Sequence, residues 1–282
     1  MTHLSVSQLD TLTKCGQQWY FRYVEGLRMP PGVRMVIGSA VDGSVNRNLQ
    51  TKIETDELMP TEAVAETARD VLNEAWSRNG VELDPEEKEL GIKKVKGAAI
   101  DRSVGLAVHH AEQLAPGLRP VQVQRKFEID LIGYDTTFLG YIDIDEGTRI
   151  RDTKTTRKGK GQVKDDVHIS TQLTAYALAK KVIDGKIPKA VKLDFVFDRY
   201  DNKRDREPQH ETFTARRTTA DFQPLLNRVE RAIEVIESGA FMPAPPGSWW
   251  CHPKWCGYWA VCPWVNKKSI SIQVPKKAGG GK

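Results

Sequence analysis

No run of apolar residues in this sequence of 282 residues is long enough to cross a bilayer. The first five residues have neither the basic stretch nor the apolar stretch of a secretory signal. Cysteine is scarce, with four residues in the chain, and without an export signal we expect these thiols not to form disulfide bonds. The sequence thus predicts a cytoplasmic protein that has no membrane partner.

Acidic residues are absent from the last stretch of the chain, residues 266–282, which contains five lysines. The formal net charge of the whole chain is +5, so subtracting these five leaves a body near neutrality. The overall charge is therefore weak evidence for a nucleic-acid partner, and only the local distribution of charge can decide the question. We expect residues 266–282 to form a basic, disordered tail.

The rest of the chain, residues 1–265, has a length that fits one large domain. The whole chain is 39% hydrophobic and 28% charged, which is typical of globular proteins, and it contains no internal repeat. We expect a single domain in three parts. These are a helical part over residues 1–118, a core of strands and helices over 119–238, and a cysteine-containing region over 239–265.

Helical patterns dominate the first part. Ser7 and Asp10 indicate a helix start, because a serine side chain can accept a hydrogen bond from a free backbone N–H and an acid favours the positive end of a helix. This helix leads to Cys15. Residues 61–79 have the spacing of an amphipathic helix, and a further helical stretch runs from about residue 85 to 115. We interpret the last two stretches as a helical insertion.

Strand patterns begin at about residue 122. Residues 124–131, 136–145 and 148–154 are predicted to be strands separated by short turns, which together form an antiparallel meander. A helix over residues 166–183, strands over 190–200 and 210–216, and a helix over 219–237 that ends at Gly239 follow. This order predicts a mixed α/β fold with a sheet flanked by helices.

Asp143 and Asp152 each lie near the end of one of two successive predicted strands. A tight hairpin would bring these carboxylates side by side, where they would repel each other unless a hard cation such as Mg²⁺ or Mn²⁺ bridged them. Such a cation polarises a phosphate oxygen and lowers the pKa of a bound water. Lys154 lies two residues beyond Asp152, so on a strand both side chains share a face. This lysine can stabilise negative charge that develops on the phosphate.

Two further groups of side chains lie close to this candidate site in the sequence. Gln172 and Tyr176 are four residues apart on the predicted helix, so both can point at the site. Between strand and helix lies a cationic loop with interleaved glycines, which we expect to contact a phosphate backbone. Its basic residues are Arg157, Lys158, Lys160 and Lys164.

The four cysteines fall into one remote residue, Cys15, and a cluster of Cys251, Cys256 and Cys262 flanked by tryptophans. Four thiolates suit either a [4Fe-4S] cluster or a structural zinc ion. Zinc sites more often use two pairs of closely spaced ligands, which favours the cluster, and free or disulfide-bonded cysteines are the third alternative. We expect the surrounding indoles to shield the site, although one or two could stack on single-stranded bases.

Taken in order, Gly-x-x-Asp at residues 140–143, Asp-x-Lys at 152–154 and Gln-x-x-x-Tyr at 172–176 resemble the motif series of PD-(D/E)xK nucleases of the RecB and AddB type. The one-plus-three cysteine pattern is similar to that of the iron–sulfur nucleases of the AddB and CRISPR-adaptation families. The resemblance covers Cys15 to Cys262 and implies a restriction-endonuclease-like fold. It further implies a Mg²⁺ or Mn²⁺ ion held by Asp143, Asp152 and the backbone carbonyl of Thr153, with a [4Fe-4S] cluster that joins the N- and C-terminal regions.

One position departs from the family pattern. Where these nucleases usually have a histidine four residues after a helix-start glycine, Gly38 is followed by Asp42. An aspartate oxygen suits Mg²⁺ at least as well as an imidazole does, so Asp42 is a candidate ligand. The alternative is that Asp42 is an ordinary polar residue of a helix.

The resemblance implies a DNA exonuclease that acts on ends or single strands. It looks like the stand-alone enzymes of phages and CRISPR loci, which process DNA for recombination, repair or spacer capture and would have protein partners there. Such an enzyme would work in the cytoplasm of the host if phage-encoded. Two alternatives remain open: an inactive iron–sulfur DNA-binding module, supported by Asp42, and a zinc-stabilised regulatory protein.

Several other residues are assigned structural positions. The aromatic residues after the first helix are expected to pack in the core, and His109 and His110 are expected on a helix surface. These aromatic residues are Trp19, Tyr20, Phe21 and Tyr23.

Overall fold

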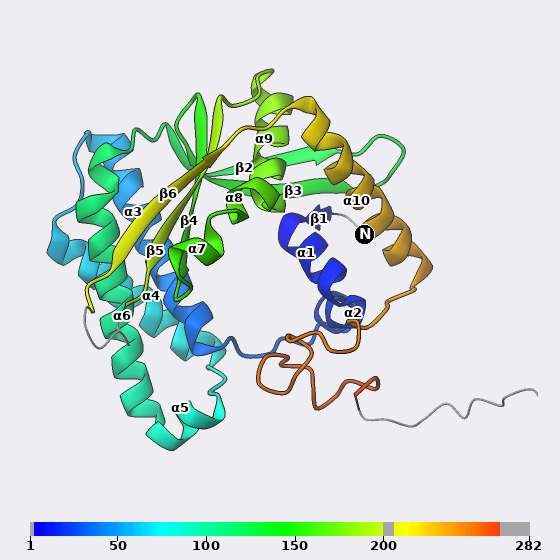
Figure 1. Cartoon of the computed structure of the whole chain (residues 1–282), viewed down its shortest axis with the longest axis horizontal. Coiled ribbons are helices and arrows are strands. Elements are labelled where there is room, and N and C mark those ends of the chain that lie inside the picture. The colour runs from blue at the N-terminus through cyan, green and yellow to red at the C-terminus, as the bar shows by residue number, and fades with distance from the viewer. Residues whose placement is uncertain (1–2, 200–205, 266–282) are drawn as a thin grey trace, which may run out of the picture.

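The computed structural model describes residues 3–199 and 206–265, which form a central sheet with helices on both faces (Figure 1). The predicted tail, residues 266–282, and Tyr200 at the end of a predicted strand lie outside the described residues. This arrangement confirms the mixed α/β fold and is consistent with the restriction-endonuclease-like class. Among the described helices, none combines the length and the apolar character that a membrane span requires.

The sheet has six strands, and its longest path runs β1-β3-β4-β5-β6, with β2 paired to β3. The antiparallel meander β2-β3-β4 is confirmed, and β4 continues into a parallel pair with β5. The three-residue β1, which pairs in parallel with β3, was not predicted, because so short a segment carries no periodicity. The strands are β1 (His3–Ser5), β2 (Gln122–Asp130), β3 (Thr137–Asp145), β4 (Arg149–Thr156), β5 (Ala190–Phe197) and β6 (Gln209–Ala215).

One edge of β3 is paired with β2 from Thr137 to Asp145. On the other edge, β1 pairs only with residues 137–139, and β4 pairs only with Ile144 and Asp145. Within the described part of the chain, residues 140–143 pair with no strand on that second edge. The sheet therefore has a gap between β1 and β4, and Asp143 lies at its margin.

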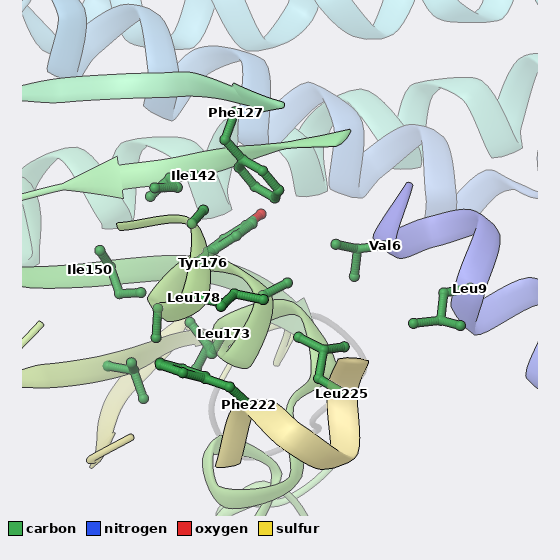
Figure 2. Close-up of a cluster of buried hydrophobic side chains, with 14 of the residues drawn as sticks. Val6, Leu9, Phe127, Ile142, Ile150, Leu173, Tyr176, Leu178, Phe222 and Leu225 are labelled. Carbon is green, nitrogen blue, oxygen red and sulfur yellow. The ribbon is translucent and has the colours of Figure 1, made fainter. Parts of the chain in front are cut away.

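On one face of the sheet, α1, α9 and α10 pack on a large apolar cluster that includes Phe127 and Ile142 from the strands (Figure 2). The short helices α7 and α8 contribute Val163 and Val167 to the same cluster. The helices are α1 (Val6–Lys14), α2 (Gly16–Tyr23), α7 (Lys160–Val163), α8 (Asp166–Ile169), α9 (Thr171–Asp184) and α10 (Thr219–Ser238).

On the opposite face, α3, α4 and α6 pack on one another and on the sheet, where Ile144 and Val196 are buried beneath them (Figure 1). The amphipathic helix over residues 61–79 is confirmed. These elements are α3 (Val33–Thr55), α4 (Thr61–Asn79), α5 (Pro85–Leu90), α6 (Ile92–Gln113) and the 3₁₀ turn η1 (Ala115–Gly117).

Helix boundaries differ from the predictions at three places. The N-cap of α1 is Ser5 rather than Ser7, and its Oγ accepts a hydrogen bond from the N–H of Gln8. The helical stretch over residues 85–115 divides at Gly91, whose φ of 82° lies outside the helical region. The helix over 166–183 divides at Ser170, whose Oγ caps α9 through the N–H of Leu173. The predicted end at Gly239 is confirmed.

The surface position predicted for the two histidines is wrong. His110 is completely buried, and His109 is half-buried with its Nε2 at 3.0 Å from Nδ1 of His210 on β6. Burial is the largest cause that lowers the pKa of His110, to about 3, so this side chain is neutral at physiological pH. Of the four aromatic residues predicted to be core, Trp19 and Phe21 are buried, whereas Tyr20 and Tyr23 are half-buried.

Candidate active site

Asp143 and Asp152 face each other across the gap in the sheet. The pairing of β3 with β4 ends at Ile144 and Arg151, and one step further along this antiparallel ladder lie the two aspartates. Asp152 is fully buried; among the described residues its Oδ1 has no hydrogen-bond partner, and its Oδ2 lies beside the ammonium group of Lys154. Burial raises the pKa of Asp152 well above its usual value, and the neighbouring carboxyl of Asp143 raises it further.

Lys154 lies on the same side of β4 as Asp152, as the sequence predicted. Its Nζ forms an ion pair with Oδ2 of Asp152 at 2.8 Å. Burial lowers the pKa of Lys154, but the carboxylates of Asp152 and Asp143 together have the larger effect, and the net pKa lies above its ordinary value. The lysine is therefore positively charged at neutral pH. Thr153, between these two residues, points to the opposite face of the strand.

A chain of hydrogen bonds links Lys154 back to Asp143 through α9. Lys154 Nζ donates to Oε1 of Gln172 at 2.9 Å, and Nε2 of Gln172 donates to the hydroxyl of Tyr176 at 2.5 Å. The Tyr176 hydroxyl donates to Oδ1 of Asp143 at 3.0 Å. These contacts bring together the five residues for which the sequence predicted catalytic roles.

Gly140, the first residue of the Gly-x-x-Asp motif, makes room for an aromatic ring. A Cβ atom at this position would lie 2.3 Å from Cζ of Phe127, which is far inside van der Waals contact. Phe127 in turn packs edge-on against Tyr176, with the ring centroids 6.3 Å apart, and Figure 2 shows these two rings side by side below β3. The glycine therefore allows the aromatic contact that holds Tyr176 beside Asp143.

The pairing of β2 with β3 is distorted at Asp143. Ile142 packs in the cluster on one face and Ile144 in the cluster on the other, although residues two apart on a regular strand share a face. Gln124, opposite Asp143 on β2, has a φ of 50°, a left-handed conformation that is uncommon for a non-glycine residue. Its Nε2 donates to Oδ1 of Asp143 at 3.3 Å. Gln124 was missed by the sequence analysis, because no residue pattern indicates a left-handed glutamine inside a strand.

A model of the PD-(D/E)XK nuclease superfamily matches residues 3–263. The chain belongs to this superfamily. No curated protein matches the sequence. Among solved structures, the crystal structure of SSO0001 is similar at 16% identity, with a TM-score of 0.36, over 90% of this chain and 95% of that chain.

PD-(D/E)XK nucleases use divalent metals such as Mg²⁺ or Mn²⁺. The buried carboxylate of Asp152 beside Asp143 suits such a hard cation, since the single charge of Lys154 does not balance two neighbouring carboxylates. Within residues 3–199 and 206–265, no three His, Cys, Asp or Glu side chains are grouped closely enough to hold a metal ion. Asp143 and Asp152 would share such an ion with further oxygen ligands from backbone, water or substrate, as is common for Mg²⁺.

Asp42 of this nuclease lies on α3 near the same carboxylates. Burial is the main cause that raises its pKa to about 6, and the negative charge of Asp143 raises it further, whereas Lys154 opposes both. Oδ2 of Asp42 accepts a hydrogen bond from Nδ2 of Asn46 at 3.1 Å. Gly38 lies inside α3, which begins at Val33, rather than at a helix start. The role of Asp42 as a metal ligand stays a prediction.

The segment predicted to be a cationic loop is partly helical, because α7 occupies Lys160–Val163. All four basic residues predicted to contact DNA, Arg157, Lys158, Lys160 and Lys164, are exposed. Lys160 forms an ion pair with Glu211 of β6 at 2.8 Å, so its charge is partly neutralised. The DNA contacts of this segment stay a prediction.

The four cysteines of the nuclease lie in one region, where the N-terminal helices meet the C-terminal segment (Figure 1). Burial raises the pKa of the Cys256 thiol, and the neighbouring thiols of Cys15, Cys251 and Cys262 raise it further. Phe21 stacks on Tyr258 at 5.5 Å between ring centroids, and the Tyr258 hydroxyl donates to the carbonyl of Leu27 at 2.9 Å. The thiols are neighbours, but they do not form a metal-binding group in the described part of the chain.

We expect the stabilisation by Mg²⁺ to increase with pH. The folded state raises the pKa of Asp42 from 3.8 to about 6, so its neutral form favours folding below pH 4, and this contribution is lost as the pH rises through 6. A cation offsets the cost of the ionised carboxylates. The rise in Tm on adding Mg²⁺, measured by thermal unfolding, should be larger at pH 8 than at pH 5 by at least about 3 °C, or about 1 kcal/mol in a chain of this size.

Two variants make this measurement specific. Asp152→Asn should lose the Mg²⁺-dependent increment at both pH values, whereas Asp70→Asn, on the exposed surface of α4, should keep it. An equal increment at pH 5 and pH 8, or one that persists in Asp152→Asn, would contradict the assignment.

Proposed function

We propose that this nuclease is a Mg²⁺- or Mn²⁺-dependent deoxyribonuclease that degrades DNA from ends or within single strands. The observation that carries the proposal is the fully buried carboxylate of Asp152 beside that of Asp143, with Lys154, Gln172 and Tyr176 on one side of the pair. The preference for ends or single strands, and a role in recombination, repair or CRISPR-type processing, are supported by the resemblance to RecB-like and AddB-like enzymes.

The bound cation would supply Lewis-acid polarisation of the scissile phosphate and a water of lowered pKa. Tyr176 and Gln124 both donate to Oδ1 of Asp143 and so orient the carboxylate, which would hold the cation together with that of Asp152. Lys154 is charged and is oriented by Gln172 at 2.9 Å, so it can stabilise the negative charge that develops on the phosphate oxygens. Asp152 is the carboxylate that most needs the cation, because it is fully buried.

The test is cleavage of end-labelled single-stranded and double-stranded DNA with Mg²⁺ or Mn²⁺. Asp152→Asn and Lys154→Met should each lower kcat by at least about 100-fold while the protein stays folded, because each removes preorganised charge from the site. Control variants with matched chemistry, Asp70→Asn and Lys93→Met on exposed helix surfaces, should cleave as the wild type does. Activity that survives chelation of the metal, or Lys154→Met with wild-type kcat, would exclude this mechanism.

We also propose that Cys15, Cys251, Cys256 and Cys262 ligate a [4Fe-4S] cluster. Their proximity supports this ligand set, and Cys15 is the residue at which α1 ends and α2 begins. Joining residue 15 to residue 251 costs roughly 5 kcal/mol of loop entropy, which metal–thiolate bonds can offset. The cluster would then hold the ends of the chain together and have a structural role.

Anaerobically purified protein should be brown, and Cys15→Ala should lose this colour together with several degrees of Tm. His252→Ala, next to Cys251, is the matched control and should keep both. Iron analysis and the visible spectrum report on the cluster, and differential scanning calorimetry reports on stability. A colourless wild type that contains zinc, or a Cys15→Ala variant with unchanged colour and Tm, would remove this ligand set.

A further inference from the structure

One face of α3 runs along β4 from the aspartates toward the carboxyl end of the strand. Gly38 lies against β4, where a Cβ on this glycine would be 3.6 Å from Oγ1 of Thr155. Arg34 and Asp42 are four residues before and after Gly38, so all three share a face of the helix. Asp42 is close enough to Asp143 and Lys154 for their charges to shift its pKa, so the Asp42 end of this helix face lies at the active site. Eight residues of helix place Arg34 about 12 Å further along.

The carboxyl ends of β4 and β5 lie side by side near the Arg34 end of this face of α3. Thr156 and Phe197 are the last pair in the parallel ladder, and the N–H of Asp198 donates to the carbonyl of Thr156 at 2.7 Å. Arg157 follows Thr156 and lies on the same strand face as Thr155, toward α3. In open α/β sheets, ligands bind at such carboxyl ends of parallel strands.

A third arginine reaches this corner from α6. Nη1 of Arg102 lies 3.7 Å from Oδ2 of Asp198, and the Arg102 side chain is 17% exposed. After burial, the charges of Arg34 and Arg102 are the next largest causes that lower the pKa of Arg157, whereas Asp198 raises it. The corner thus gathers arginines from three different segments, and Asp198 lies near Arg102 and Arg157.

Such an arrangement favours an anion. The positive charges of neighbouring arginines repel one another. A bound phosphate is attracted to each of them and so offsets this repulsion. The planar guanidinium group also binds phosphate oxygens through two parallel hydrogen bonds. Arg34 lies about 12 Å of helix beyond Asp42, so the phosphate that this corner fits differs from the one that is cleaved.

We propose that Arg34, Arg102 and Arg157 bind a backbone phosphate of the DNA strand about 12 Å from the scissile phosphate, along α3. This site rests on the proposed nuclease function and sets the register of the strand in the active site. Of these residues, the sequence indicated only Arg157, as part of a basic loop.

The experiment measures binding of a labelled single-stranded oligonucleotide in the presence of Mg²⁺, with every protein carrying Asp152→Asn to prevent cleavage. Arg34→Gln and Arg157→Gln should each lower the slope of log K against log salt by about 0.7, the value for one phosphate contact on a single strand. Arg47→Gln is the matched control, because Arg47 is an exposed arginine on the same helix. It should leave the slope unchanged.

A second arm replaces one phosphate at a time with an uncharged methylphosphonate. One linkage should lower the affinity of the arginine-intact protein about tenfold, equivalent to about 1.4 kcal/mol. Arg34→Gln and Arg157→Gln should lose this sensitivity at that same linkage and keep the sensitivity to the others. Unchanged salt slopes, or equal effects of every linkage in all proteins, would overturn the arginine site.

Cleavage by the protein with Asp152 intact is measured in parallel and separates the two proposals. If that protein cleaves DNA and the arginine variants bind like the control, the phosphate site fails and the nuclease assignment stands. If it cleaves no DNA, the proposed function fails, and the phosphate site fails with it.

Discussion

The carboxylate of Asp152 is the constraint on which the rest of the site depends. An ionised carboxylate that is fully buried, next to a second carboxylate, is unfavourable unless positive charge balances it. Lys154 supplies one such charge at 2.8 Å, and a divalent cation, as the superfamily uses, would supply the rest. The excess negative charge of the two carboxylates destabilises the site without a metal, and the same excess charge favours binding of a divalent cation.

The fold creates this environment through an interruption in the sheet. Because β1 and β4 share one edge of β3, residues 140–143 are left between them, and the strands separate where Asp143 is needed. At Gln124 and Asp143 the regular alternation of side chains between the two faces of the sheet is interrupted. The left-handed backbone of Gln124 lies at this interruption. Backbone strain of this kind persists only where the surrounding packing enforces it. Here that packing comes from Phe127, Tyr176 and the adjoining core.

Much of this arrangement followed from local sequence patterns. Alternating strands, the i and i+4 spacing of Gln172 and Tyr176, and the two-residue step from Asp152 to Lys154 are properties of neighbouring residues, and the structure brings these side chains together. The helix that ends at Gly239 was predicted for the same reason, because glycine at a C-cap is a local signal.

The features that were missed depend on tertiary contacts. The burial of His110 follows from the packing of α6, and the third arginine at the corner of β4 and β5 lies 55 residues before Arg157 in the chain. The division of two predicted helices at Gly91 and Ser170 is a boundary effect that apolar periodicity does not resolve. Periodicity likewise reports which residues are apolar but not where a strand changes face, so Gln124 gave no signal.

The most direct measurement of the central claim is a crystal structure with bound Mn²⁺, located by anomalous scattering. The account requires one ion in contact with an oxygen of Asp143 and an oxygen of Asp152, at about 2.0 to 2.3 Å from each. An ion bound by only one of these aspartates, or by residues elsewhere, would contradict it.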